Sequence, residues 1–547
     1  MPISASLSKN FRFLVLEVIK QADNALRVLD EGDVSSIRKI RSRDDYIDHL
    51  KSIIENKCFA YLRRAEIDKG TVDTIRSLNI IASNLEHIAD HAVSIVGQTL
   101  HFSDAKFIQR YDYEPFFQVV FQALEKVISA FDRRDSSLAL EICKAEVELD
   151  RLYRAKFERI LAEMSSGGNV ANLTTALFVF QYMERIGDCL ENIGEAILFS
   201  KMGEKMKIHQ YEALRQTLSS RGSSEPGESV RYEGIWGTRS GAVIGKVSAA
   251  SLDSAEKNDV IFKEGDTQKI IEEKENLERW NRLVPGLAPR VVDFQQGEGD
   301  AAILIEYLKG STFQDIVLSG ELELVDEALF SIQQTIQKIW RETRLPEPTR
   351  PNFLAQLHSR LEDVFAVHPN FSGSFQQIGG LAIPDFRQNL QGALRLDERL
   401  LAPFSVFGHG DFNLDNIIYN VDRKQVHFID VHRSGQMDYA QDISVLLVSA
   451  FRLPVFDKSV RRRLNQLVLS FYRMSRRFAA EQGDATYPAR LAAGLVRSFV
   501  TSTRFEFHRH FASEMMMRAE YLLERLRGHD KRTWEDFKFP EDMLRYW

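Results

Sequence analysis

Three side chains in the C-terminal half of the chain have the types and spacing that phosphoryl transfer to a hydroxyl requires. Asp411 is followed five residues later by Asn416, and Asp430 ends a short apolar run over 426–429. In this chemistry an aspartate accepts or orients the proton of the attacking hydroxyl, while an asparagine and a second aspartate bind Mg²⁺. We therefore expect Asp411 to be catalytic and Asn416 and Asp430 to be metal ligands.

The residues around this string predict a rigid support for it. Residues 417–419 and 426–429 are β-type runs, and residues 420–424 have the composition of a hairpin turn. His409 is expected to orient the backbone and the region of Asp430 without transferring a proton. Asp438 and Asp442 belong either to the functional string or to a helix N-terminus and a surface charge.

The string from His409 to Asp442 resembles the aminoglycoside phosphotransferase and choline kinase-like family, a relative of the protein kinases. Gly410 stands where protein kinases usually have Arg, and Val431 and His432 follow Asp430. The resemblance covers residues 232–530 and implies an α+β, two-lobed fold that uses ATP and Mg²⁺ to phosphorylate a small-molecule hydroxyl.

This resemblance also implies nucleotide-binding residues in the preceding lobe. Lys263 would be the strand lysine that binds the nucleotide α/β phosphates, with Glu275 as its partner and Glu272 as the alternative. Backbone groups of Glu306 and Leu308 would meet the adenine. Three glycines lie where the loop over the phosphates belongs, although they do not form a Gly-x-Gly-x-x-Gly pattern: Gly234, Gly237 and Gly241.

The acceptor is not specified by these motifs. It would be selected by the helical lobe, around residues 352–397 and 462–524. A cationic acceptor would need acidic residues such as Asp438 or Glu506 near the cleft. Three aromatic residues are either a cation-binding wall or, as we favour, ordinary core: Trp340, Phe505 and Phe507.

A different acidic pattern occurs twice in the N-terminal part. Glu and Asp stand four residues apart at Glu86 and Asp90, and again 98 residues later. Side chains four apart share one face of a helix. A second acidic pair precedes each copy, so four carboxylates could converge in each half: Asp44, Asp48, Glu86 and Asp90 in the first, and Glu146, Asp150, Glu184 and Asp188 in the second. Such sets would suit a divalent cation, and solvated acidic faces are the equally weighted alternative.

The segments at 86–95 and 184–193 resemble the PhoU-like phosphate-uptake regulators, over residues 8–210. The resemblance implies two duplicated three-helix bundles, metal binding by the acidic pairs, and a role in phosphate regulation with a transport or signalling protein as partner. The chain differs from the family at Ala89 and Cys189, where Gly and His are frequent. His91 is expected to be surface or packing and not a ligand.

Periodicity divides the chain into regions that agree with both resemblances. Apolar residues three and four apart predict about six long helices before residue 215. Residues 219–229 hold Gly, Ser and Pro without a large apolar residue, as in a linker. The predicted organisation is a helical domain over 1–215, a linker over 216–231, a sheet-bearing lobe over 232–310 and a helical lobe over 311–547.

Composition excludes several other classes of protein. Among 547 residues, 44% are hydrophobic and 27% charged, which excludes disordered and low-complexity chains. The net charge of -7 argues against nucleic acid as a partner. No apolar run reaches the ~18 residues of a membrane span, and the N-terminus lacks the pattern of a signal peptide. We expect a cytoplasmic protein, and a homodimer is compatible with the sequence.

Two functional readings follow. In the first, the chain is a phosphotransferase whose helical domain ties activity to phosphate status. In the second, the kinase-like part is a non-catalytic nucleotide sensor and the helical part binds a partner. The simultaneous presence of Lys263, Asp411, Asn416 and Asp430 favours the first, and the unusual glycine loop favours the second.

Overall fold

The computed structural model describes the chain except for a set of short segments. The described residues are 5–31, 37–63, 67–204, 206–219, 230–234, 243–249, 259–297, 300–373, 376–378, 381–530 and 532–546. They divide into two compact units, Met1–Phe262 and Lys263–Trp547. The predicted domain limits at 215 and 231 remain a prediction, because most of the linker lies outside the described residues.

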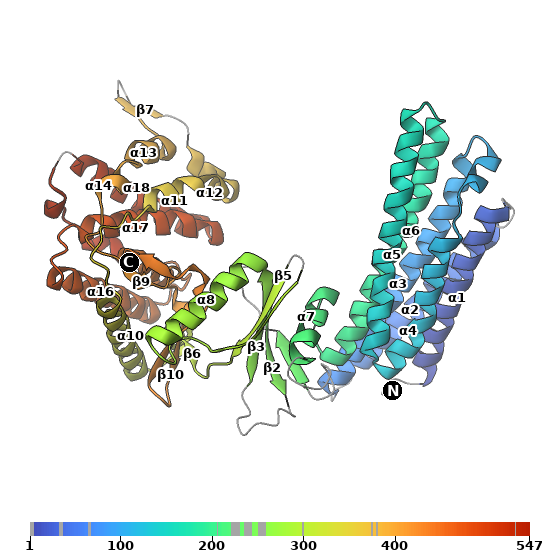
Figure 1. The fold of residues 1–547 in the computed structure, drawn as a ribbon, viewed down its shortest axis with the longest axis horizontal. Helices are drawn as coiled ribbons and strands as arrows, with labels where there is room; N and C mark the ends of the chain where they lie inside the picture. The colour runs from blue at the N-terminus through green and yellow to red at the C-terminus, as the bar shows by residue number, and fades with distance from the viewer. Residues whose placement is uncertain are drawn as a thin grey trace. The chain divides into compact units, whose positions relative to one another are not determined.

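The first unit is dominated by long helices, as the apolar periodicity predicts. Figure 1 shows α1 to α6 running alongside one another. The helices are α1 (Ala5–Glu31), α2 (Ile37–Leu62), α3 (Lys69–Gln98), α4 (Glu114–Arg133), α5 (Ser136–Ser165), α6 (Val170–Met202) and α7 (Ile208–Ser219). The α3 helix packs against α2 and α6, and α5 packs against α4 and α6. Each half of the duplication therefore contributes three long helices.

Local sequence fixes where these helices begin and end. The side chain of Asp68 accepts a hydrogen bond from the Thr71 N–H at the start of α3, and Asn169 caps α6 in the same way. Gly203 ends α6 in the left-handed conformation that glycine favours. Within α6, a Cβ at Gly194 would overlap the Cys143 Sγ of α5, so glycine permits the close approach of these two helices.

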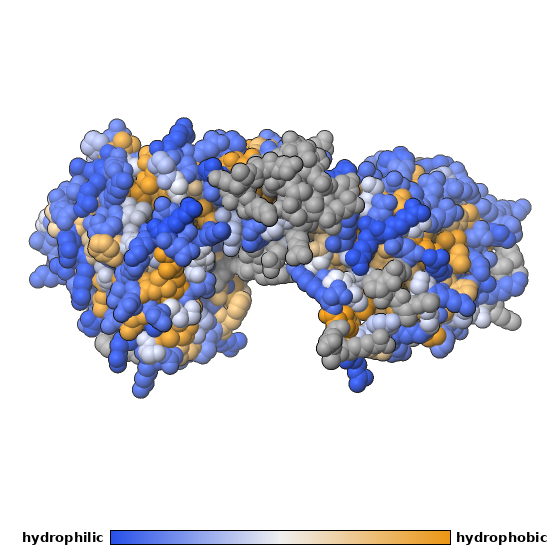
Figure 2. All heavy atoms as spheres, turned by 90° about the horizontal axis from the view of Figure 1, so that it is seen from below, coloured by the Kyte–Doolittle hydropathy of each residue, from blue (hydrophilic) through white to orange (hydrophobic). Residues whose placement is uncertain are grey.

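The predicted apolar stripe of α1 forms part of the core. Its six members are each at most 1% exposed: Phe11, Leu14, Val18, Ala22, Ala25 and Leu29. Burial of such a stripe supplies the main stabilisation of an amphipathic helix. On the face shown in Figure 2, hydrophilic residues predominate and hydrophobic residues form small, separate groups.

A five-stranded sheet in the order β1-β2-β3-β5-β4 contains the predicted runs around Lys263 and Ile303. The strands are β1 (Val230–Gly234), β2 (Val243–Ala249), β3 (Val260–Asp266), β4 (Val291–Gln296) and β5 (Asp300–Glu306). Helix α8 (Thr267–Leu283) follows β3 directly and packs against β4 and β5. This α8 helix is the element that can reach a lysine on β3.

The rest of the second unit is mostly helical. Its helices are α9 (Phe313–Ser319), α10 (Leu322–Glu342), α11 (Phe353–Ser359), α12 (Leu361–Val367), α13 (Phe386–Ala393), α14 (Leu396–Arg399), α15 (Ala440–Phe451), α16 (Lys458–Glu481), α17 (Tyr487–Ser502) and α18 (Arg509–His529). Its short strands are β6 (Ser311–Thr312), β7 (Gln376–Ile378), β8 (Leu381–Ile383), β9 (Val406–Gly408), β10 (Ile417–Asn420), β11 (Gln425–Phe428) and β12 (Gly435–Met437). The predicted hairpin exists: β10 pairs antiparallel with β11, with Ile417 opposite Phe428.

Candidate active site

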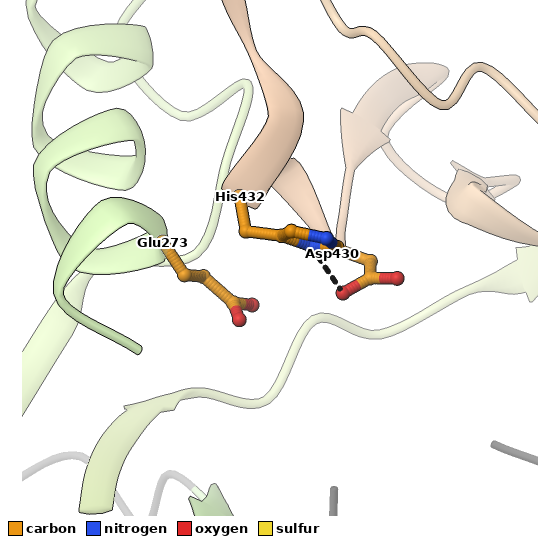
Figure 3. Close-up of side chains that lie close together, drawn as sticks. All are labelled: Glu273, Asp430 and His432. Carbon is orange, nitrogen blue, oxygen red and sulfur yellow. Dashed lines mark hydrogen bonds and ion pairs between the residues drawn. The ribbon is translucent and has the colours of Figure 1, made fainter. Parts of the chain in front are cut away.

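Lys263 links the sheet to the segment that follows β11. Its side chain is buried on β3, and its Nζ lies 2.5 Å from Glu273 Oε2 and 2.8 Å from Asp430 Oδ1. Figure 3 shows Glu273 extending from α8 toward Asp430 and His432. Two carboxylates thus share one ammonium group, and they raise the pKa of Lys263 although burial opposes them.

The predicted partner of Lys263, Glu275, is wrong, and so is the alternative Glu272. Glu275 is exposed, and Glu272 accepts a hydrogen bond from Gln268 within the same helix. Glu273 makes the ion pair because the buried face of α8 runs through Ile270, Glu273, Leu277 and Trp280. Three- and four-residue steps within the apolar stripe are the sequence signal that selects residue 273.

The same face of α8 holds the segment after Asp430. Asn276 Nδ2 donates to the His432 carbonyl at 3.2 Å, and Trp280 Nε1 donates to Ser434 Oγ at 2.9 Å. Glu273, Asn276 and Trp280 lie on successive turns, so one helix positions both the lysine and this segment. The segment 431–433 is a 3₁₀ turn, labelled η6 (Val431–Arg433).

Asp430 has a constrained backbone and a stabilised charge. Its φ of 58° lies in the left-handed region, which is uncommon for a residue with a side chain. Burial would raise the pKa of Asp430, but the hydrogen bond with His432 and the charge of Lys263 outweigh it and lower the pKa well below its usual range. Asp430 is therefore a carboxylate at neutral pH.

Asp411 lies in a loop that is connected by hydrogen bonds to Asp430. Asn416 Nδ2 donates to the Asp411 carbonyl at 2.8 Å, and the Ile429 N–H donates to the Asn416 carbonyl at 3.0 Å. The Asp411 carboxylate accepts from Asn413 Nδ2 at 2.6 Å and pairs with Arg433 at 2.9 Å. The structure thus brings Asp411, Asn416 and Asp430 together in one hydrogen-bonded region.

Gly410 distinguishes this loop from the corresponding loop of protein kinases. Its φ is +81°, and a Cβ there would overlap the Arg433 carbonyl oxygen. Only glycine adopts this conformation without strain, and it also leaves room for the close approach of the segment after Asp430. The arginine usual in protein kinases would not fit.

Asp442 and His409 hold the backbone near Asp411 and Asp430 in place through hydrogen bonds. Asp442 Oδ2 accepts from the His409 N–H at 2.7 Å, and Asp442 Oδ1 accepts from the Gly410 N–H at 2.8 Å. The His409 ring hydrogen-bonds to the Ile429 carbonyl at 3.0 Å, so this side chain orients backbone near Asp430 as expected. Asp442 is 2% exposed, which corrects the alternative of a surface charge.

Asp438 has a structural role in the same lobe. It lies just before α15 and is buried against Arg490, with 2.8 Å between Asp438 Oδ2 and Arg490 Nε. Arg490 also pairs with buried Asp484 at 2.6 Å. Asp438 is thus engaged inside the lobe and is not available to a cationic acceptor.

Two sets of side chains near Asp430 could supply ligands to Mg²⁺. The oxygens of Asn416 and Asp430 fit the ion better than the set formed by Glu273, Asp430 and His432. Glu273, Asp430 and His432 have potential ligand atoms within 4.8 Å of one another. However, the Lys263 ammonium already lies between the two carboxylates and supplies the positive charge. Asn416 uses its Nδ2 internally, which leaves its amide oxygen, and Asp430 has a second carboxylate oxygen. Hard oxygen donors of this kind are those that Mg²⁺ prefers.

The segment expected to meet adenine follows β5. Glu306 ends β5, and its N–H is already bound to the Arg290 carbonyl at 2.9 Å. The N–H of Leu308 has no hydrogen-bond partner among the described residues. Gly234 is the last residue of β1, whereas Gly237 and Gly241 lie outside the described residues.

In the first unit, the acidic residues of the first half converge. Asp48, Glu86 and Asp90 have carboxylate oxygens within 4.8 Å of one another. Burial and the charges of Asp90 and Asp48 raise the pKa of Asp44 to about 6. Asp44 Oδ1 and Glu86 Oε2 are buried without a hydrogen-bond partner among described residues. These four residues will be called the first quartet.

The second half repeats this arrangement more loosely. Burial, followed by the charges of Glu191 and Asp150, raises the pKa of Glu146. Glu184 accepts a hydrogen bond from Gln181, and Asp150 pairs with Arg154. In the described part of the chain, this second quartet does not bring three ligand oxygens within 4.8 Å of one another.

His91 and its counterpart in the second half, Cys189, are engaged in packing within the helical domain. The His91 ring packs against Tyr182 with centroids 5.9 Å apart, as the packing interpretation expects. Burial, with the charges of Arg185 and His87, lowers the pKa of His91 to about 4. Cys189 is buried, which raises its thiol pKa to about 12. His91 is therefore a neutral ring packed on Tyr182, and Cys189 is a neutral thiol at pH 7.

Comparisons with known proteins match the two parts separately. The PhoU domain model matches residues 14–99 and 116–197, and the model described as phosphotransferase enzyme family matches residues 261–478. The chain joins a PhoU domain to a phosphotransferase-family domain. The PhoU match repeats in the two halves, in agreement with the duplicated acidic pattern.

Several curated relatives match the PhoU domain. A phosphate-specific transport system accessory protein PhoU homolog from Clostridium acetobutylicum is 28% identical over 206 residues, covering 35% of this chain and 88% of the relative. A homolog from Borreliella burgdorferi is 28% identical over 200 residues, covering 35% of this chain and 89% of the relative.

Solved structures resemble each domain at low identity. PhoU from Pseudomonas aeruginosa has 20% identity and a TM-score of 0.33, covering 36% of this chain and 97% of that one. Aminoglycoside phosphotransferase APH(3'')-Id from Streptomyces rimosus has 22% identity and a TM-score of 0.32, covering 50% of this chain and 92% of that one.

The residues considered for a cationic acceptor do not form a site in the phosphotransferase domain. Trp340 is fully buried against Tyr439 and Phe478, so it is core as favoured. Phe505 and Phe507 are 45% and 82% exposed, so the prediction that they are core is wrong. The carboxylate of Glu506 accepts from the His508 N–H at 2.7 Å. Among the described helices, none is long and apolar enough to span a membrane.

Proposed function

We propose that the phosphotransferase domain transfers the terminal phosphoryl group of ATP, with Mg²⁺, to the hydroxyl of a small molecule. The observation that carries this proposal is the contact of Lys263 with both Glu273 and Asp430, next to a loop that holds Asp411 and Asn416. A buried lysine with two acidic partners is costly to maintain without a function, since each charge must be desolvated.

Each residue has a role that its position supports. Asp411 accepts a hydrogen bond from the acceptor hydroxyl and orients its oxygen toward the phosphoryl group. Lys263 binds nucleotide phosphate oxygens, and Glu273 keeps its ammonium group in place. Asn416 and Asp430 hold Mg²⁺ through their amide and carboxylate oxygens; when bound, the ion neutralises charge on the phosphates.

The adenine would bind beside the segment after β5. The N–H of Leu308 is the backbone donor we assign to it. At Glu306 the N–H is used by Arg290, so the carbonyl is the group we assign. Backbone contacts of this kind select the base without any requirement on the side chains.

ATP consumption by the purified full chain tests this proposal. Wild-type protein should release ADP with at least one member of a panel of hydroxyl compounds. Asp411→Ala should lower turnover by about a thousandfold or more while ATP binding stays within threefold. Asp415→Ala is the matched control, because Asp415 is exposed in the same loop. Turnover by the Asp411 variant equal to wild type would refute the catalytic assignment.

The second candidate function is a non-catalytic nucleotide sensor. One observation favours it: both carboxylate oxygens of Asp411 are engaged, one by Asn413 and one by Arg433. In a sensor this ion pair would persist with nucleotide bound. ATP binding without turnover on any compound of the panel would favour the sensor.

For the PhoU domain we propose divalent metal binding by the acidic quartets and coupling of phosphotransferase activity to phosphate status. The metal proposal is supported by the convergence of Asp48, Glu86 and Asp90 and by the unpartnered oxygens of Asp44 and Glu86. The coupling follows the relatives, whose names place them with phosphate-specific transport, and it implies a transport or signalling protein as partner. Turnover measured across a range of inorganic phosphate, with and without chelator, tests the coupling.

A further inference from the structure

Four arginines of the phosphotransferase domain belong to the helical lobe that carries Asp411. They come from separate elements of the helical lobe: Arg360, Arg433, Arg497 and Arg504. Arg433 pairs directly with Asp411 at 2.9 Å. The other three come from the junction of α11 with α12 and from α17 and the turn after it, which pack against one another. We call these four residues the arginine cluster.

Arg497 is tied to the catalytic loop through neutral groups. Its Nη1 donates to Gln441 Oε1 at 2.8 Å, and Gln441 Nε2 donates to the Gly410 carbonyl at 2.9 Å. Its other partners include Gln356 and Ser444, and its Nε is buried without a partner among the described residues. Arg497 is 4% exposed, so its charge is buried with no carboxylate at ion-pair distance in the described chain.

Arg360 extends the cluster toward solvent. It follows Gln356 by four residues and is half-buried between α11 and α12. Its guanidinium has no hydrogen-bond or ion-pair partner among the described residues. Burial, together with the charges of Arg433 and Arg504, lowers the pKa of Arg360, while Asp411 and Asp363 oppose this. Gln356 Oε1 accepts a hydrogen bond from Arg497 Nη1 at 3.3 Å, so Arg360 lies one helical turn from a residue that contacts the buried arginine.

The nearby carboxylates do not balance the cluster. Asp411 is paired with Arg433, and Asp363 is paired with Arg504 at 2.9 Å. Asp442 uses its oxygens on the N–H groups of His409 and Gly410. Two positive charges, on Arg360 and Arg497, thus have no ion-pair partner among the described residues. A buried or half-buried cation without a partner is costly unless a ligand supplies the negative charge.

Resting on the proposed phosphotransferase function, we infer that the acceptor carries an anionic oxygen group, a carboxylate or a phosphate, beside the hydroxyl that Asp411 orients, and that Arg360 binds this group. The planar guanidinium matches both groups through paired N–H donors. Arg433 contacts Asp411, and Arg497 is hydrogen-bonded to the same loop through Gln441, whereas Lys263 and the metal-binding oxygens belong to the nucleotide in the proposed function. A cationic acceptor would be repelled at the same place.

Binding to the full chain, saturated with Mg²⁺ and a non-hydrolysable ATP analogue, tests this inference without requiring turnover. The probes are inorganic phosphate, D-glycerate and glycerol 3-phosphate, with glycerol and choline as neutral and cationic comparisons. The anions should bind at least about tenfold more tightly than glycerol or choline. Whichever of glycerate and glycerol 3-phosphate binds more tightly shows whether the site prefers a carboxylate or a phosphate.

Substitution of Arg360 supplies the second arm. Arg360→Gln should weaken anion binding about tenfold or more, and Arg360→Lys should retain part of it. The control is Arg476→Gln, an exposed arginine paired with Glu541 in the same lobe, which should leave anion binding unchanged. Thermal unfolding of each variant verifies folding.

The outcomes separate this inference from the proposed function. Failure of all three anions to bind, binding that Arg360→Gln leaves unchanged, or preference for choline would each overturn the inference. Arg360-dependent anion binding supports it, even if no hydroxyl compound is phosphorylated. In that last case the catalytic proposal fails and anion recognition stands.

Discussion

The PhoU domain and the phosphotransferase domain each gather carboxylates, but they treat the charge in opposite ways. In the first quartet, Asp48, Glu86 and Asp90 repel one another, and the pKa of Asp90 is raised by burial and by Asp48. In the phosphotransferase domain, the protein supplies Lys263 and His432 to Asp430, and the pKa of Asp430 is lowered. Within the described chain, Glu86 is the member of the quartet that pairs with cationic side chains, Lys51 at 3.9 Å and His87 at 3.5 Å, whereas Asp430 lies 2.8 Å from Lys263. The acidic charge of the quartet is therefore compensated less completely than that of Asp430.

This difference predicts opposite results for matched removals of charge. Replacing a carboxylate by its amide removes a stabilising charge in the paired site and a repulsive one in the quartet. The sign of the change in stability, measured without metal, therefore tests the comparison itself. The predictions below run from the largest expected effect to the smallest.

The largest effect is expected at Glu273. Glu273→Gln leaves the buried Lys263 with a single acidic partner, so we expect a loss of about 2 kcal/mol of stability and at least a tenfold loss of kcat/KM for ATP. Glu275→Gln is the matched control two residues away, and it should change kcat/KM by less than twofold. Steady-state kinetics and thermal unfolding measure both effects. Equal losses in the two variants would contradict the assignment of Glu273.

A smaller effect of opposite sign is expected in the first quartet. Asp90→Asn should raise the Tm of the chelated protein, because it removes repulsion, and should weaken Mn²⁺ binding to the PhoU domain about tenfold. Asp188→Asn should weaken Mn²⁺ binding less, since the second quartet is looser. Calorimetric titration with Mn²⁺ measures this, with exposed Glu158→Gln as the control. A lower Tm for chelated Asp90→Asn would show that the quartet is not repulsive.

The smallest effect concerns Glu264, a buried carboxylate on β3. Its residue is 6% exposed, its Oε2 has no hydrogen-bond partner among described residues, and burial followed by Asp300 raises its pKa to about 7. The folded protein therefore binds the proton more tightly than the unfolded chain. Stability from this group is present below its ordinary pKa and falls as pH rises to about 7.

Thermal unfolding between pH 4.5 and 8 tests this effect. Glu264→Gln should be more stable than wild type at pH 8 and nearly equal to it at pH 4.5. The expected difference at pH 8 is about 1 kcal/mol, because solvent screens part of the carboxylate charge. The difference should stop growing above pH 7. A constant difference across the range would show that the carboxylate titrates normally in the fold.

The helices and the phosphotransfer string were predictable because their signals are local. The apolar stripe of α1 and the hairpin of β10 and β11 follow from periods of 3.6 and 2 in the sequence. The order of Asp411, Asn416 and Asp430 reflects one loop and one hairpin, so spacing alone indicates that they lie together. The prediction for Glu275 failed because the resemblance indicated the helix but not which of its residues face the interior. The buried stripe of Ile270, Leu277 and Trp280 determines that face.

Other features depend on tertiary contacts that a single sequence does not reveal. Asp442 reads as an ordinary acidic residue early in a helix, and only the fold brings it to the N–H groups of His409 and Gly410. The arginine cluster draws residues 360, 433, 497 and 504 from distant elements, with no common spacing. Arginines are frequent in this chain, so the contact of Arg433 with Asp411 and the link of Arg497 to the same loop could not be predicted before the fold was known.

The account depends most on the metal and nucleotide site, and a diffraction measurement tests it directly. The full chain would be crystallised with a non-hydrolysable ATP analogue and Mn²⁺ in place of Mg²⁺, and the ion located by its anomalous signal. We predict Mn²⁺ about 2.1–2.2 Å from oxygens of Asn416 and Asp430, with Lys263 Nζ at the nucleotide phosphates. An ion bound away from Asn416 and Asp430, or phosphates beyond reach of Lys263, would contradict the account.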